Sequence, residues 1–206
     1  MKARLFFFTF LLFLFLFSAC SKNNSENEVF GRVTEFGTEK PLEGAEVYIL
    51  DCRISGSTTS CDTVRTLITD AAGTYSSGFP AASNGRTPKI GVALPGYFEH
   101  DTHFIRKHND NEIDFVLDPF AWLSVRVVNE APAGELDRIR LTFNPSGGGW
   151  KELTGSNVNE LLFDIVMGNR PKTIQWKTYS LGEITSQMID TVEVSAHDTL
   201  NYEIRY

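Results

Sequence analysis

Residues 45–50 read AEVYIL, and within them Ala45, Val47 and Ile49 occupy alternate positions. Successive side chains of a β-strand point to opposite faces, so this alternation predicts a strand with one face on a core. The same period of two recurs along the chain, whereas no stretch after residue 19 keeps apolar residues at helical spacing over several turns. The sequence therefore predicts an all-β protein.

Further strands are predicted on both sides of this stretch, over residues 29–33, 64–69, 89–94 and 113–117. Residues 69–75 (TDAAGTY) predict a tight turn, because Asp70 can accept a backbone N–H group and Gly73 allows a positive φ. Short strands separated by such turns are typical of an antiparallel β-sandwich. We expect one sandwich over residues 28–119.

Several short motifs in this region resemble the carboxypeptidase regulatory-like domain, a transthyretin-like sandwich. The similar motifs are FGRV at 30–33, PLEGAEV at 41–47, the turn at 69–75, LPGY at 94–97 and IDFVLDP at 113–119. In metallocarboxypeptidases this module follows a zinc-binding catalytic domain, whose His-x-x-Glu motif is absent from this sequence. The resemblance implies a scaffold or binding module without peptidase chemistry.

After Pro119 the strand pattern starts again, with predicted strands near residues 123–127, 139–143, 161–166, 174–178, 192–194 and 200–206. We expect a second β-sandwich over residues 120–206, of Ig-like or fibronectin-like type. One continuous sandwich is the alternative, but the break at Pro119 and the number of strands favour two tandem domains.

The first nineteen residues are typical of an export signal. Lys2 and Arg4 precede an apolar block over residues 5–17, which is shorter than the roughly 20 residues that a bilayer span needs. The following Ser18-Ala19-Cys20 resembles the lipobox of bacterial lipoproteins, although Phe17 stands where Leu is usual. The resemblance implies cleavage before Cys20 and lipidation of its thiol; an ordinary secretory signal is the alternative.

Residues 20–27 are polar and predict a flexible tether between the lipid and the fold. The tether resembles in part the acidic stretch of surface-exposed lipoproteins of Bacteroidota, with Lys22 interrupting it. That resemblance implies a lipid-anchored protein of the outer membrane or cell surface, with the membrane as one partner.

The charge of the chain argues against nucleic acid as a partner. The 19 basic and 26 acidic residues give a net charge of −7, and loss of Lys2 and Arg4 with the signal leaves 17 basic residues and a net charge of −9. An acidic protein repels phosphate backbones.

If Cys20 carries lipid, Cys52 and Cys61 remain as an even pair, which predicts a disulfide in an exported protein. Residues 53–60 between them are rich in Ser, Thr and Gly and are predicted as a loop. Closing it would stabilise the fold by about 2 to 3 kcal/mol. A metal site is the alternative, yet no further ligands follow at zinc-like spacing.

Two other clusters have residue types that bind metals. His100 and His103, with His108, could supply imidazole ligands, but residues three apart on a strand face opposite sides, which favours solvated loop histidines. Asp110 and Glu112 offer oxygen ligands for calcium but lack the EF-hand pattern, so a polar turn is favoured. We therefore predict no metal and no cofactor.

Aromatic residues near turns are the candidate ligand-binding residues, because exposed rings on a β-sandwich can stack on sugars. They are Trp150, Tyr75, Phe79, Tyr97 and Phe98. The alternative is that these rings pack the cores, or that Trp122 and Trp150 fill the junction between the two sandwiches.

Serine-nucleophile, phosphate-loop and dinucleotide motifs are absent from the sequence. The leading hypothesis is a non-catalytic module that recognises a glycan or a partner protein. A subunit of a surface assembly and a carboxylate- or metal-dependent hydrolase are the alternatives.

Overall fold

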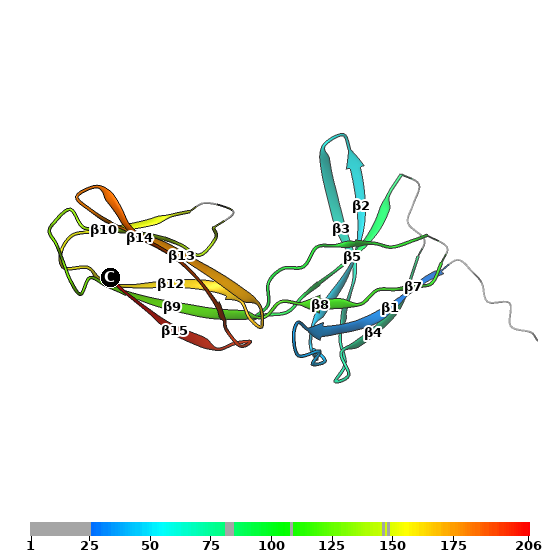
Figure 1. The fold of residues 1–206 in the computed structure, drawn as a ribbon. Coiled ribbons are helices and arrows are strands. Elements are labelled where there is room, and N and C mark those ends of the chain that lie inside the picture. Colours follow the sequence, from blue (N-terminus) through cyan, green and yellow to red (C-terminus); the bar gives the residue numbers. More distant parts are fainter. Residues whose placement is uncertain (1–25, 81–84, 108, 146, 148) are drawn as a thin grey trace, which may run out of the picture.

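The computed structural model describes residues 26–80, 85–107, 109–145, 147 and 149–206. The expected export signal and Cys20 lie outside the described residues. Every regular element in the described part is a β-strand (Figure 1), so the predicted all-β class is confirmed. No helix in this part has the length and apolar character of a membrane span.

The first sandwich packs the sheet β4-β1-β7, which β8 joins through β1, against the sheet β3-β2-β5-β6. Its strands are β1 (Glu26–Glu35), β2 (Glu46–Ser55), β3 (Thr58–Ile68), β4 (Thr74–Pro80), β5 (Thr87–Ala93), β6 (His103–Phe104), β7 (Asn111–Glu112) and β8 (Phe115–Leu117). The alternation at residues 45–50 has the expected effect, because Ala45, Val47 and Ile49 are fully buried in the first core.

The second sandwich packs the sheet β12-β9-β15 against the sheet β11-β10-β13-β14. Its strands are β9 (Phe120–Val128), β10 (Arg138–Thr142), β11 (Lys151–Thr154), β12 (Asn159–Met167), β13 (Pro171–Ser180), β14 (Glu183–Glu193) and β15 (Thr199–Arg205). Its core is separate from the first, and the alternate residues Leu123, Val125 and Val127 of β9 are fully buried in it.

Most strand pairs are antiparallel, as the fold class predicts, but three are parallel. β1 pairs in parallel with β7 and β8, and β15 pairs in parallel with β9. Side chains alternate with the same period in both kinds of pair, so the sequence pattern does not distinguish them.

The prediction of a loop over residues 53–60 is wrong, because β2 and β3 continue through this segment as a hairpin arm. The arm ends in the two-residue turn Gly56-Ser57 and projects from its sandwich (Figure 1). The Ser and Thr content suggested a loop, but threonine also suits strands. The Cys52–Cys61 disulfide is confirmed, and it joins two residues directly opposite each other in the arm.

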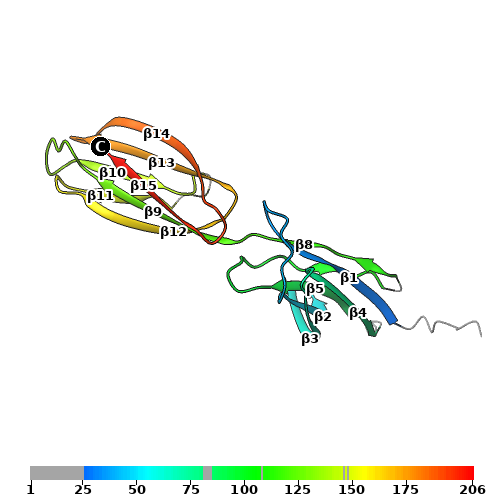
Figure 2. The ribbon, with the colours of Figure 1, turned by 90° about the horizontal axis from the view of Figure 1, so that it is seen from below.

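The two sandwiches lie end to end, as both Figure 1 and Figure 2 show. At their junction Asn169 donates a side-chain hydrogen bond to the carbonyl of Phe36 at 2.8 Å, and Arg170 pairs with Asp118 at 2.5 Å. A Cβ atom at Gly37 would lie 2.6 Å from that of Asn169, so this position has no room for a side chain.

Candidate functional site

The predicted aromatic residues do not gather on one surface. Tyr75 is 5% exposed in the first core and donates its hydroxyl to the carbonyl of Ile113. Burial, followed by the charge of Asp114, raises the pKa of Tyr75. Phe79 pairs through its backbone with Asn27, and its side chain lies outside the described part.

Tyr97 and Phe98 lie at the junction of the two sandwiches. The Tyr97 hydroxyl donates to the buried Glu35 carboxylate at 2.7 Å, and the ring meets His197 edge to face. Burial and this hydrogen bond raise the pKa of Tyr97. Phe98 packs edge to face on Phe120 with ring centres 4.6 Å apart. Both residues therefore hold the junction together.

Trp150 lies on the second sandwich, directly before β11. The Arg140 guanidinium and the Lys177 ammonium both lie 5.6 Å from the centre of its ring. Nearby, the Arg138 guanidinium lies 4.2 Å from the ring centre of Tyr179. We call these five residues the cationic-aromatic face.

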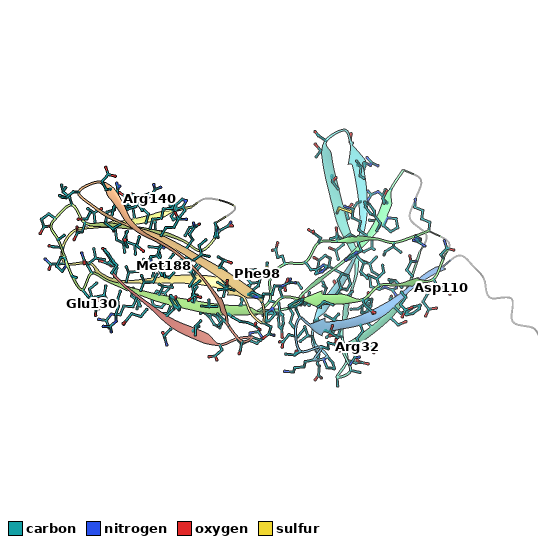
Figure 3. All side chains as sticks on the ribbon, viewed as in Figure 1. Arg32, Phe98, Asp110, Glu130, Arg140 and Met188 are labelled. Carbon is teal, nitrogen blue, oxygen red and sulfur yellow. A yellow bond between two sulfur atoms is a disulfide. The ribbon has the colours of Figure 1, made fainter. Side chains whose placement is uncertain are left out.

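Strand pairing explains why the strand residues of this face point the same way. Arg138 pairs with Tyr179 and Arg140 with Lys177 in the β10–β13 register, while the intervening Ile139 is fully buried. Residues two apart on a strand share a face, so the cations point outward where Ile139 points inward. Figure 3 labels Arg140 on this part of the second sandwich.

The cationic-aromatic face carries more positive than negative charge. Glu152 lies 3.7 Å from Arg138 and 3.4 Å from Arg140, and among the described residues Lys177 makes no ion pair. Two of the three cations therefore share one carboxylate and the third pairs with none in the described part, on a chain whose net charge is −7. A guanidinium stacked on a ring keeps its N–H edge free for a carboxylate or a sulfate.

The histidine pair comes together, in contrast to the expectation from strand geometry. The rings of His100 and His103 stack with centres 5.4 Å apart, and each meets the ring of Phe115. Only His103 belongs to a strand. The backbone before it is irregular, so the rule that residues three apart on a strand face opposite sides does not apply to this pair. In the part of the chain that the structure describes, no three His, Cys, Asp or Glu residues are grouped to hold a metal.

The segment with Asp110 and Glu112 is held by Asn111. The Asn111 side chain accepts from the Arg106 amide at 2.8 Å and donates to the carbonyls of Arg106 and Asn109. These bonds close a polar turn, which is the interpretation that the sequence favours over calcium.

Two other carboxylates serve local structure. Asp70 accepts hydrogen bonds from the hydroxyl and amide of Thr74, which lower its pKa, and Gly73 has φ 73°, as the predicted turn requires. Burial acts to raise the pKa of Asp137, but hydrogen bonds from Ala133 and Gly134 outweigh it and lower the pKa. Both carboxylates therefore hold the local backbone of a turn.

The sequence did not single out the cations of the face, although one signal was present. Arg138 and Arg140 alternate with core residues, which places two cations on the solvent side of one strand. Their approach to Lys177 depends on the pairing of β10 with β13, which are separated along the chain by β11 and β12.

Comparisons with known proteins assign no family to the chain. No family profile matches it, and no curated protein matches it. Among solved structures, a minor pilin of Streptococcus agalactiae is 11% identical, with 87% of this chain and 94% of that chain covered and a TM-score of 0.40. A shaft pilin of Lactobacillus rhamnosus GG is 10% identical, with 87% and 97% covered and a TM-score of 0.37.

The Bacillus anthracis TIE protein is 11% identical over 87% of this chain, with a TM-score of 0.38, and this chain spans about a third, 34%, of its length. At these TM-scores the similarity carries no conclusion about what this chain does.

Proposed function

We propose that this chain is a non-catalytic recognition module held at a membrane surface, and that its cationic-aromatic face binds an anionic glycan. One observation carries the proposal: three cations, Arg138, Arg140 and Lys177, lie beside the rings of Tyr179 and Trp150 on an acidic chain. Arg138 and Arg140 pair with the one carboxylate of Glu152, and Lys177 makes no ion pair among the described residues. The cations suit carboxylate or sulfate groups, and the rings suit the apolar faces of sugars.

The rest of the chain would position this face. The lipobox-like Cys20 and the tether over residues 20–27 support an anchor at the outer membrane or cell surface. Residues 28–119, which resemble the carboxypeptidase regulatory-like domain, would form a scaffold domain, and residues 120–206 the recognition domain. The junction contacts support a fixed spacing between the two.

Glycan binding can be tested with residues 21–206, which contain both cores. Uronate-containing or sulfated polysaccharides should bind, and neutral ones should not. Arg140→Ala and Trp150→Ala should each weaken binding about tenfold, the effect of losing roughly 1.4 kcal/mol. Arg126→Ala is the matched control, because Arg126 lies on β9 in the other sheet. Equal binding by all three variants would contradict the proposal.

The anchor can be tested separately in an exporting bacterial host. Full-length protein should enter the membrane fraction, with a lipid mass on the peptide that begins at Cys20. Cys20→Ala should remove that mass and abolish membrane retention. An unmodified Cys20 in a soluble exported protein would support the ordinary secretory signal instead.

A further inference from the structure

A row of exposed apolar side chains runs along the outward face of β12. Four successive outward positions are apolar, and we call them the β12 stripe: Leu161 is 52% exposed, Phe163 63%, Ile165 54% and Met167 43%. The outward face of an antiparallel sandwich strand is ordinarily polar. A contiguous apolar surface of this kind marks an interaction site.

β12 is also the edge strand of its sheet. In the described part of the chain it pairs with β9 alone and lies at the outer edge of the sandwich (Figure 2), so the other side of its backbone has no partner strand there. Its nine residues extend about 30 Å at roughly 3.4 Å per residue. Trp122 of β9, which pairs with Ile165, is 36% exposed on the same face and widens the stripe. A free edge beside an apolar stripe is suited to the addition of another strand.

The other long edge strand of the second sandwich does not share this arrangement. β14 also exposes apolar residues, but Met188 pairs with Trp176 while Ile189 pairs with Gln175, so the two lie on opposite faces. Only β12 of these two edges joins a single-faced stripe to an unpaired backbone.

We propose that two copies of this chain associate through their β12 edges, as antiparallel strands related by a two-fold axis at Phe163. In this register the two Phe163 rings are opposite each other, and Leu161 is opposite Ile165 of the second copy. Aromatic and branched side chains in such cross-strand positions stabilise a sheet. The stripe is therefore complementary to itself.

Charge selects this register over its neighbour. An axis at Asp164 would also match the apolar residues, but it would place the two Asp164 carboxylates directly opposite each other, which is unfavourable. An axis at Phe163 places Asp164 opposite Leu162.

The resulting assembly is closed. Pairing of one edge with its own copy uses the same surface on both chains, so growth stops at the dimer. The proposal goes beyond glycan recognition, because the cationic-aromatic face lies on the other sheet and stays free on both copies. A dimer would thus present two such faces to one ligand.

Sedimentation equilibrium of residues 21–206 tests the association. The chain should form a dimer, and Phe163→Lys should weaken it at least about tenfold, because a buried unpaired charge costs more than 1.4 kcal/mol. Ile189→Lys is the matched control, since Ile189 is 62% exposed on β14, and it should leave the dimer intact. Both variants should keep the unfolding temperature of the monomer. A chain that stays monomeric, or a dimer indifferent to Phe163→Lys, would overturn the proposal.

Cysteine cross-linking tests the register. In a glutathione buffer that preserves the Cys52–Cys61 disulfide, Phe163→Cys should form a disulfide-linked dimer, whereas Asp164→Cys and Ile189→Cys should not. Faster linking of Asp164→Cys or equal linking of Ile189→Cys would refute the register. Lost dimerisation with intact glycan binding would reject this inference alone, and the reverse result would reject the recognition proposal alone.

Discussion

The two long hairpins, β2–β3 and β13–β14, show how this chain holds strands that lie away from a core. Their outer strands β3 and β14 are both 11 residues long, and all but one residue of each is exposed. Each hairpin also has one register shift, at Ile49/Leu50 and at Thr178/Tyr179. Outer strands with so little burial depend on links to their neighbours.

The links differ between the two hairpins. The β2–β3 arm has a disulfide, and Arg86 lies within 3.4 Å of Asp51 and 2.9 Å of Asp62. The β13–β14 hairpin has noncovalent links, among them a hydrogen bond between the hydroxyls of Thr178 and Thr185 at 2.8 Å and one from Tyr202 of β15 to Asp190. The β2–β3 arm therefore has a covalent link in addition to its polar contacts, whereas the links described for the β13–β14 hairpin are all noncovalent.

Their turns differ as well. In the arm, Gly56 has φ 61° and tolerates it, because glycine lacks a Cβ atom. In the other hairpin both turn residues are in the left-handed region, Leu181 at φ 51° and Gly182 at φ 89°. Leucine is strained there.

The largest loss of stability is expected from substitutions at the points where the two hairpins enter their cores. Ile49 of β2 and Ile174 of β13 are both fully buried. Ile49→Ala and Ile174→Ala should each lower the free energy of unfolding by about 2–5 kcal/mol, through lost burial and the cavity left behind. Hydrogen exchange should show lost protection in the substituted sandwich only. Equal loss in both would mean that they unfold as one unit.

Removal of the disulfide should give the second-largest loss of stability. The pair Cys52→Ala and Cys61→Ala should destabilise the first sandwich by about 2–3 kcal/mol, because the cross-link restricts the unfolded chain. Limited proteolysis should then cut the arm first. The matching pair Thr178→Val and Thr185→Val should cost only about 1 kcal/mol. Similar costs for both pairs would remove the distinction between the hairpins.

Removal of the hydrogen bond from Tyr202 to Asp190 should give a smaller, pH-dependent loss of stability. Burial, followed by the hydrogen bond to Asp190, raises the pKa of Tyr202 to about 12. A raised pKa stabilises the folded state below the unfolded pKa of about 10, and this contribution is lost as the pH rises toward 12. Tyr202→Phe should cost about 1 kcal/mol at neutral pH and flatten this alkaline loss in a denaturation series. An unchanged alkaline slope would argue against the contact.

The smallest expected effect is a gain in stability from relief of strain in the turn at Leu181. Leu181→Asn should stabilise the second sandwich by roughly 0.5–1 kcal/mol, because asparagine suits the left-handed conformation of such hairpins. Leu181 is 82% exposed, so little packing is lost. Ser57→Asn in the arm should be neutral in the same urea titration. A loss of stability in Leu181→Asn would contradict the claim that Leu181 is strained.

Alternation in the sequence predicted the strands and their buried faces correctly where only one face of a strand is apolar, as in β9. It could not assign faces in residues 161–166, where apolar residues are almost continuous: Leu162 and Val166 meet the core, and Phe163 faces solvent. For the same reason the β12 stripe was invisible in the sequence. The candidate aromatic residues were separated because their positions along the chain do not report which sheet holds them.

The sequence by itself determined the two-residue periodicity, the turn at Asp70 and Gly73, the pairing of Cys52 with Cys61 and the acidic charge. These features depend on local backbone geometry, on composition, or on the small number of available partners. The tertiary structure alone decided which strands pair, that Arg140 meets Lys177, and that β12 is left as a free edge. Such contacts join distant segments, and they become favourable only when whole sheets pack together.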